Sequence, residues 1–388
     1  MNNLLITMSG GTTSVINATL AGLILKAQKS NLIDKIYVGF PGIEGFLSDK
    51  VLNLTNLNDR ELSILKKSPG SASIGTTRAK IFDDETLNIL SEKFEEYKIK
   101  YFVNIGGNGT IKQSKLISSK IDNVITAAAP KTVDNDLGDS EFDLLWYTPG
   151  FPSCVNYWYH KMLMSNNENY GAYSHDKILV SQTFGRETGF LVGSMRMFDV
   201  NRKIPLLLLI PEDNQSQQKI LDAVDNKLSE HGRVLIGICE GYDVAQYDSR
   251  FDHTGQKMYG SSSSTSMQEM INLLNDNGMQ SRGYNPTVDQ RQNFEYTLDS
   301  DIEISYQTGE KIIENFEDGN ENFFQSYSRS GFVSVPIDKI NNFSRKMRDE
   351  WIDHGGFDVT DEYIKYLNEF MDVSKPKDLF LGGKLYEV

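Results

Sequence analysis

The chain of 388 residues is 39% hydrophobic, which allows two or three domains with buried cores. Its net charge of −14 and its lack of a basic stretch argue against nucleic acid and membranes as partners, because such interfaces depend on clustered Lys and Arg. No apolar run approaches the roughly 20 residues that span a bilayer. The two cysteines, Cys154 and Cys239, suggest no disulfide framework, so we expect a soluble protein of the reducing cytoplasm.

Short apolar runs alternate with helix-patterned stretches through the first two thirds of the chain. This alternation is typical of βαβ units and predicts an α/β fold with mostly parallel sheets. Several runs are apolar at consecutive positions, as expected for strands that helices cover on both faces. We expect the more polar last hundred residues to complete these sheets rather than to form a third domain. The predicted strands are 4–7, 36–40, 101–105, 124–128, 178–182, 204–210 and 234–239.

The residues that follow each strand are the candidates for a site, because open α/β sheets bind ligands at the carboxyl ends of their strands. The first strand leads into the glycine turn Met8-Ser-Gly-Gly-Thr-Thr13 and then into an amphipathic run that predicts a helix. Gly10 and Gly11 would let backbone N–H groups approach an anion at the start of that helix. The spacing fits neither a P-loop nor a dinucleotide motif, so a plain tight turn is the alternative.

Two further segments suit phosphate binding. Gly75-Thr-Thr-Arg78 places an arginine beside small hydroxyl residues, although a solvated surface arginine explains it equally well. Ile105-Gly-Gly-Asn-Gly-Thr110 is a second glycine turn after a strand, and we expect a helix to begin near Ile111. Two such turns at strand ends are harder to explain as independent tight turns.

The fourth predicted strand leads into Ala129-Pro-Lys-Thr-Val-Asp-Asn-Asp136, which has the layout of a phosphoryl-transfer site. One carboxylate of Asp134 and Asp136 can face a reacting hydroxyl while the other faces a metal. Lys131 supplies a point charge for phosphate oxygens. Taken alone, the segment could also be an Asx-rich turn after a strand.

Charged side chains also follow the strands of the second half. Arg186, in Phe184-Gly-Arg186, and Glu240 each come directly after a predicted strand, and Glu240 offers a carboxylate for sugar hydroxyls. Arg282 and Arg291 flank a turn at Asn285-Pro286. Each arginine alone fits a solvated surface, but together with Lys177 they would form an anion pocket.

In this order, the motifs resemble the phosphofructokinase family, and the opening at residues 9–22 is most similar to its pyrophosphate-dependent branch. The similarity covers about residues 4–310 and also includes Thr148-Pro-Gly-Phe151, Ile210-Pro-Glu212 and Gln290-Arg291. It implies two Rossmann-like, three-layer αβα domains with the active site in the cleft between them. The larger, donor-binding domain would comprise 1–148 and about 291–345, and the smaller, sugar-phosphate-binding domain 149–290 and about 346–388. A homo-oligomer, a dimer or a tetramer, is also implied.

The resemblance further implies Mg²⁺-dependent transfer of a phosphoryl group from pyrophosphate or ATP to the 1-hydroxyl of fructose 6-phosphate, a glycolytic step that gives fructose 1,6-bisphosphate. Asp134 would be the general base, assisted by Asp136, while Arg186 and Lys131 would steady the phosphoryl group. Asn108 and Asp136 would hold the metal. The donor site would be lined by Gly11, Arg78, Gly107, Asn108, Gly109 and Thr110. The sugar phosphate would contact Thr132, Lys177, Phe184, Gly185, Glu240, Arg282 and Arg291, with Lys177 and Arg282 reaching in from a neighbouring subunit.

Several positions depart from the family's pattern and leave alternatives open. Position 109 is commonly Asp in pyrophosphate users and Gly in ATP users, so Gly109 leaves the donor undecided although Lys131 matches the pyrophosphate branch. Asn108 replaces a frequent aspartate, Lys177 a usual arginine, and Val288 a frequent histidine or tyrosine. A different sugar phosphate, or a regulatory paralogue without activity, would fit these changes. A nicotinamide-dependent oxidoreductase is poorly supported, because the dinucleotide spacing is missing.

Overall fold

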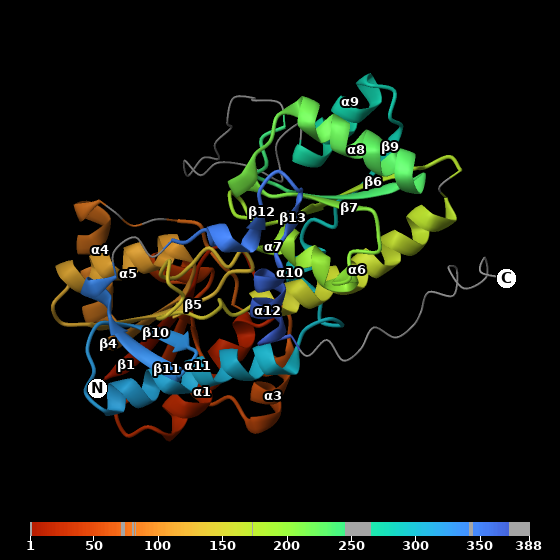
Figure 1. Cartoon of the computed structure of the whole chain (residues 1–388). Coiled ribbons are helices and arrows are strands. Elements are labelled where there is room, and N and C mark those ends of the chain that lie inside the picture. The colour runs from red at the N-terminus through yellow and green to blue at the C-terminus, as the bar shows by residue number, and fades with distance from the viewer. Residues whose placement is uncertain are drawn as a thin grey trace. The chain divides into compact units, whose positions relative to one another are not determined.

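A computed structural model describes residues 2–70, 74–79, 81, 83–172, 174–244, 265–340 and 344–371. The chain divides into two compact units (Figure 1). Unit 1 comprises Met1–Ser153 and Arg291–Arg345, and unit 2 comprises Cys154–Gln290 and Lys346–Val388. The end of the second predicted domain, 372–388, lies outside the described residues. Within the described residues, no helix is long and apolar enough to cross a membrane.

Unit 1 is built on a seven-stranded sheet with the order β11-β10-β5-β4-β1-β2-β3. The central strands are parallel, whereas β3 and β11 at the two edges run antiparallel to their neighbours. The strands are β1 (Asn3–Met8), β2 (Ile36–Gly39), β3 (Val51–Asn53), β4 (Ile99–Gly106), β5 (Ile125–Pro130), β10 (Phe323–Ser328) and β11 (Gly331–Pro336).

Helices cover both faces of this sheet because its strands are apolar on both sides. Along β1, Leu4 and Ile6 pack with α1, α3 and α11, whereas Leu5 packs with α2, α4 and α5 on the other face. Helices α1 and α11 lie side by side (Figure 1), since a Cβ on Gly22 would stand only 2.0 Å from the carbonyl oxygen of Tyr306. The helices are α1 (Ile16–Lys29), α2 (Gly42–Leu47), α3 (Asp59–Lys67), α4 (Asp84–Glu96), α5 (Asn108–Lys120), α11 (Asp299–Glu317) and the 3₁₀-helix η3 (Ile337–Lys339).

Unit 2 contains a four-stranded parallel sheet with the order β7-β8-β6-β9. Helices α8 and α9 pack on one face, and Gly237 admits Val192 and Met195 to the other face. The strands are β6 (Ile178–Thr183), β7 (Leu206–Leu209), β8 (Val234–Cys239) and β9 (Ser281–Tyr284). The helices are α6 (Phe151–Gly171), which starts within unit 1, α7 (Phe190–Ser194), α8 (Gln217–His231), α9 (Ser266–Asp276), α10 (Asp289–Gln292), which ends in unit 1, and the 3₁₀-helices η1 (Met195–Asp199) and η2 (Pro211–Asp213).

A C-terminal hairpin and helix attach to unit 2 through a buried arginine. Arg196 is 2% exposed and binds both carboxylate oxygens of Asp358, with Nε donating at 2.9 Å and Nη2 at 2.8 Å. Bidentate pairing of this kind satisfies the guanidinium and the carboxylate together. The attached elements are η4 (Asp349–Trp351), β12 (Ile352–Asp353), β13 (Asp358–Val359) and α12 (Asp361–Asn368).

The predicted α/β class with mostly parallel sheets is confirmed, and all seven predicted strands are present as strands. As expected, the late part of the chain completes a sheet, because β10 and β11 extend the sheet of unit 1. The predicted start of the helix near Ile111 is wrong by three residues. Helix α5 already begins at Asn108, because Gly107 serves as its N-cap residue and Gly109 lies within its first turn.

A buried carboxylate joins α11 to the start of α6. Asp301, in the first turn of α11, is fully buried and accepts hydrogen bonds from the N–H of Gly150 (3.1 Å), the N–H of Ser153 (3.2 Å) and the Ser153 hydroxyl (2.6 Å). It thereby satisfies N–H groups that the first turn of α6 leaves without helical partners. Burial raises the pKa of Asp301 from 3.8 to about 6, although these hydrogen bonds oppose the shift.

The raised pKa of Asp301 predicts a pH-dependent stability. Because the folded pKa lies above the unfolded value, the stabilisation is present below about pH 4 and is lost as the pH rises through about 6. Between pH 5 and 7, urea unfolding should show the wild type losing on the order of 1 kcal/mol relative to Asp301→Asn, which cannot titrate. A difference between the two proteins that stays constant over this range would contradict the raised pKa.

Candidate active site

The predicted residues of unit 1 follow three adjacent strands, and Lys131 ties the three strand ends together. Strands β5, β4 and β1 are parallel neighbours, so their carboxyl ends share one edge of the sheet. The N–H of Lys131 donates to the carbonyl of Gly106 (3.0 Å), the last residue of β4. Its Nζ donates to the carbonyl of Ser9 (2.9 Å) and to that of Gly11, after β1. The side chain is only 4% exposed, and the carbonyl partners compensate for the water that its ammonium loses.

The first glycine turn contacts a predicted sugar-phosphate residue. Gly10 has a φ of 79°, a left-handed conformation that favours glycine. A Cβ on Gly11 would lie 2.6 Å from Nη1 of Arg291, so Arg291 packs directly against this turn. The exposed Arg78 is also near, because the N–H of Gly10 donates to the carbonyl of Thr77 (2.9 Å).

The second glycine turn forms the N-terminus of α5, where unpaired N–H groups and the helix dipole favour an anion. Gly106 must lack a side chain, since a Cβ would stand 2.1 Å from Oγ1 of Thr110. Gly109 is exposed, and a Cβ there would meet nothing within 4 Å. Asn108 Nδ2 donates to Oδ2 of Asp136 at 3.2 Å, so the two predicted metal ligands lie together.

The segment Asp134–Asp136 forms a tight turn whose middle residue is left-handed. Asn135 has a φ of 58°, which asparagine tolerates better than most residues. The hydroxyl of Thr132 donates to Oδ2 of Asp134 (3.2 Å) and accepts from its N–H (3.2 Å). The predicted general base and its predicted sugar-binding neighbour are therefore in contact, and Asp134 is only 8% exposed.

Arg345 is the residue of this site that the sequence did not reveal. Its side chain is 2% exposed and donates to Asn135, the central residue of the turn, from 210 positions further along the chain. The sequence carries no local signal for such a contact.

In unit 2, the strand ends of β6 and β8 bring four predicted residues together. The N–H of Arg186 donates to Oε1 of Glu240 at 3.4 Å. The thiol of Cys239 lies under the turn within hydrogen-bonding distance of the carbonyls of Phe184 (3.5 Å), Arg186 (3.2 Å) and Thr188 (3.4 Å). Gly185 completes the turn with a φ of 123°, and Arg186 itself has a φ of 52°. Sequence analysis did not identify Cys239 as part of this arrangement.

Lys177 and Arg282 do not lie with these four residues. Lys177 precedes β6, and Arg282 pairs in register with Leu179, the second residue of β6, whereas Arg186 and Glu240 follow the far ends of their strands. Both side chains are exposed, and Nη2 of Arg282 forms an ion pair with Asp176 at 2.7 Å. Within one chain, Lys177 and Arg282 therefore lie at the opposite edge of the sheet.

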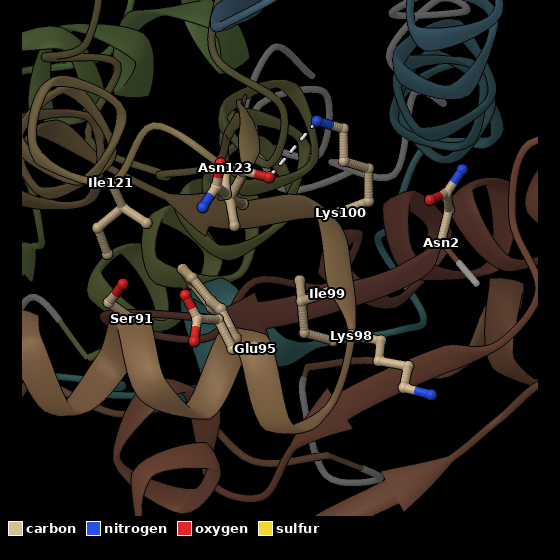
Figure 2. Close-up of a pocket in the computed structure, with 10 residues that line it drawn as sticks. Asn2, Ser91, Glu95, Lys98, Ile99, Lys100, Ile121 and Asn123 are labelled. Atoms are coloured by element: carbon tan, nitrogen blue, oxygen red, sulfur yellow. Dashed lines mark hydrogen bonds between the residues drawn. The ribbon is translucent and has the colours of Figure 1, made fainter.

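A pocket in unit 1 (Figure 2) lies at the edge of the sheet opposite the predicted site residues. Ile99 begins β4 and Asn2 directly precedes β1, whereas the predicted residues follow the carboxyl ends of these strands. Figure 2 shows Lys100 donating to the carbonyl of Asn123, at 3.4 Å, on the rim of this pocket. The lining residues are Asn2, Ser91, Phe94, Glu95, Lys98, Ile99, Lys100, Ile121, Asn123 and Val124.

Comparisons with known proteins agree with the motifs. Residues 3–293 match the model of the family described as Phosphofructokinase. The pyrophosphate–fructose 6-phosphate 1-phosphotransferase of Rhodospirillum rubrum is 24% identical over 96% of this chain and 94% of its own length. The protein of the same name from Halomonas elongata is 26% identical over 94% and 91%. The crystal structure of a pyrophosphate-dependent phosphofructokinase from Nitrosospira multiformis superposes with a TM-score of 0.83 at 24% identity, covering 98% of this chain and 94% of that one.

The contacts of Lys131 predict that Lys131→Met lowers the melting temperature by several degrees. Each buried carbonyl left without its donor is destabilising by about 1–3 kcal/mol. The variant should also gain less thermal stabilisation from added pyrophosphate, because the first glycine turn loses the hydrogen bonds that Nζ of Lys131 donates to Ser9 and Gly11. Differential scanning fluorimetry with Lys112→Met, an exposed lysine on α5, as control would check both effects. Equal melting of Lys131→Met and wild type would contradict the anchoring role.

Proposed function

The chain belongs to the phosphofructokinase family, and from this premise we propose that it is an enzyme that transfers a phosphoryl group from pyrophosphate to the 1-hydroxyl of fructose 6-phosphate. The products would be fructose 1,6-bisphosphate and phosphate. One observation carries the proposal: Asn108, Lys131 and the turn at Asp134–Asp136 meet at three adjacent strand ends. The full-length relatives from R. rubrum and H. elongata, both named for this reaction, support it.

In this reaction Asp134 would accept the proton of the 1-hydroxyl while the oxygen of that hydroxyl attacks a phosphorus atom of pyrophosphate. A new P–O bond forms to the sugar, the bond to the leaving phosphate breaks, and the phosphate carries the electron pair away. The contact between Thr132 and Asp134 would orient the carboxylate toward the hydroxyl. Because this chemistry needs little covalent help, positioning and neutralisation of charge should supply most of the rate.

The residues at the second glycine turn fit Mg²⁺. Asp136 offers a carboxylate and Asn108 an amide oxygen, and the amide nitrogen of Asn108 keeps the two side chains together by donating to Asp136 at 3.2 Å. Oxygen ligands are those that Mg²⁺ prefers. Among the described residues there is no group of three or more His, Cys, Asp or Glu side chains that could hold a metal ion. Proteins often bind Mg²⁺ through one or two carboxylates plus substrate phosphates. When bound, the ion would neutralise phosphate charge. Lys131 and the N-terminus of α5 would supply the remaining positive potential.

Unit 1 would bind the donor, through Gly11, Arg78 and the glycine turn at 106–110, and unit 2 the sugar phosphate. Arg186 would steady the phosphoryl group, and Glu240, Phe184 and Gly185 would contact the sugar. Arg291, which belongs to unit 1, would also contact the sugar phosphate, at its 6-phosphate.

Lys177 and Arg282 lie at the opposite edge of their sheet from Arg186, so we assign them to the site of a neighbouring copy in a dimer or tetramer. The buried thiols of Cys154 and Cys239 suit a reducing compartment, and we place the enzyme in the cytoplasm.

The direct test is fructose 1,6-bisphosphate formation from fructose 6-phosphate and Mg²⁺, with pyrophosphate and with ATP in parallel. Asp134→Asn should lower kcat by roughly 10²–10⁴, the usual contribution of a general base, while the melting temperature stays close to that of the wild type. Asp143→Asn, an exposed carboxylate of the same loop, is the control and should keep full activity.

Near wild-type turnover of Asp134→Asn would contradict the role of Asp134 as general base. Silence of the wild type with both donors, together with thermal stabilisation by fructose 6-phosphate, would instead favour a non-catalytic paralogue. Silence without such stabilisation would favour a different sugar phosphate, for which Lys177 and the 44% exposed Val288 replace the family's usual phosphate ligands.

Gly109 predicts how the donor is chosen. The space around its Cβ position is open, so Gly109→Asp should fold normally and place a carboxylate where ATP, the larger donor, would extend beyond the pyrophosphate site. The variant should raise the inhibition constant of ATP against pyrophosphate at least tenfold through like-charge repulsion. Its kcat/KM for pyrophosphate should change less than about threefold, because the smaller donor does not reach position 109. Gly109→Ala is the uncharged control, and an unchanged inhibition constant for Gly109→Asp would refute this explanation.

A further inference from the structure

The guanidinium of Arg345 is bound by the loop that carries the two predicted catalytic carboxylates. Its Nε donates to the carbonyl oxygen of Asn135 at 2.9 Å, and its Nη2 donates to Oδ1 of the same residue at 2.7 Å. Its Nη1 donates to the carbonyl of Leu145. The donors of a guanidinium lie in one plane in a fixed arrangement, so the group can hold the main chain and the side chain of one residue at once. A lysine ammonium has no such fixed arrangement of donors.

The rest of the loop closes around this group. Phe142 lies against the guanidinium, whose central carbon is 3.9 Å from the ring centroid. Gly138 lies on it as well, since a Cβ there would stand 2.8 Å from Nη1. The main chain of Arg345 also takes part, because its N–H donates to the carbonyl of Asp136 at 2.8 Å. The loop between β5 and α6 therefore wraps around Arg345.

Arg345 binds at the point where the turn is least favourable. Asn135 is left-handed, at a φ of 58°, and stands between Asp134 and Asp136. Asparagine adopts this conformation more readily than most other non-glycine residues, but it still costs free energy that contacts with the surroundings must offset. The N–H of Thr148 also donates to Oδ1 of Asn135 at 3.0 Å, so the side chain that Arg345 holds is fixed from two sides.

From this geometry we propose that Arg345 is a positioning residue for phosphoryl transfer. It fixes the turn at Asn135 and thereby sets the position of Asp134 relative to the attacking hydroxyl, without contacting the substrate. The inference rests on the proposed function. A misplacement of about 1 Å in a reacting group can lower the rate of the chemical step roughly 100-fold while binding is little changed.

The test compares Arg345→Met and Arg345→Lys with Arg196→Met. Arg196 is equally buried and also makes a bidentate contact, but it serves the C-terminal hairpin of unit 2 and has no part in the site. We expect kcat to fall roughly 100-fold in Arg345→Met and at least tenfold in Arg345→Lys, with KM for both substrates within about threefold of the wild type. Arg196→Met should lower the melting temperature but keep kcat within about threefold.

Wild-type kcat in Arg345→Met or Arg345→Lys, together with a lowered melting temperature, would reduce Arg345 to a structural residue and overturn the inference. Should Arg345→Met not fold, the Arg345→Lys variant decides alone. A second readout does not require activity: hydrogen exchange should accelerate in peptides covering residues 131–150 in both Arg345 variants and not in Arg196→Met. Unchanged exchange there would overturn the inference even if the wild type proved inactive, so its failure is distinct from failure of the proposed function.

Discussion

The buried ammonium of Lys131 is the interaction on which the arrangement of unit 1 depends. Parallel strands end at a common edge, but that alone leaves the following loops without fixed positions. Lys131 joins the loops after β5, β4 and β1 through its own N–H and its Nζ. Because its partners are main-chain carbonyls, the contact constrains the course of the backbone rather than one replaceable side chain. The glycine turns and the turn at Asn135 lie close in sequence to the strand ends that Lys131 joins.

In each unit, the turn that carries candidate site residues is held in a similar way. In unit 1 the turn has a left-handed Asn135 and is held by Arg345, and in unit 2 it has a left-handed Arg186 and lies over the thiol of Cys239. In both cases the holding group comes from a different segment and binds carbonyl oxygens. A guanidinium is a charged donor and a thiol is a weak one, so these two holding contacts differ in strength.

Much of this architecture could be predicted from local patterns, and the remainder has identifiable causes. The seven predicted strands exist because continuous apolar runs are a strong signal for buried parallel strands. Strands β3 and β9 and the β12–β13 hairpin were not predicted, because they are short and mixed in polarity. The start of α5 was misplaced because glycines at 107 and 109 have low helix propensity, which tertiary contacts override. Lys131, Asp134 and Asp136 follow a strand directly, and for that reason the sequence makes them candidates. Arg345 is not one of them, because long-range contacts leave no trace in neighbouring residues.

The sequence distance between Arg345 and Asn135 also has a consequence during synthesis. The two residues are 210 positions apart, and a ribosome adding about 5–20 residues per second needs roughly 10–40 s to cover that distance. Throughout that interval the nascent chain has β1, β4, β5 and both carboxylates, but its turn has no guanidinium to close around. Unit 1 is assembled from two segments with most of unit 2 synthesised between them. The emerging polypeptide thus lacks the contacts that close the turn at Asn135 until Arg345 has been added.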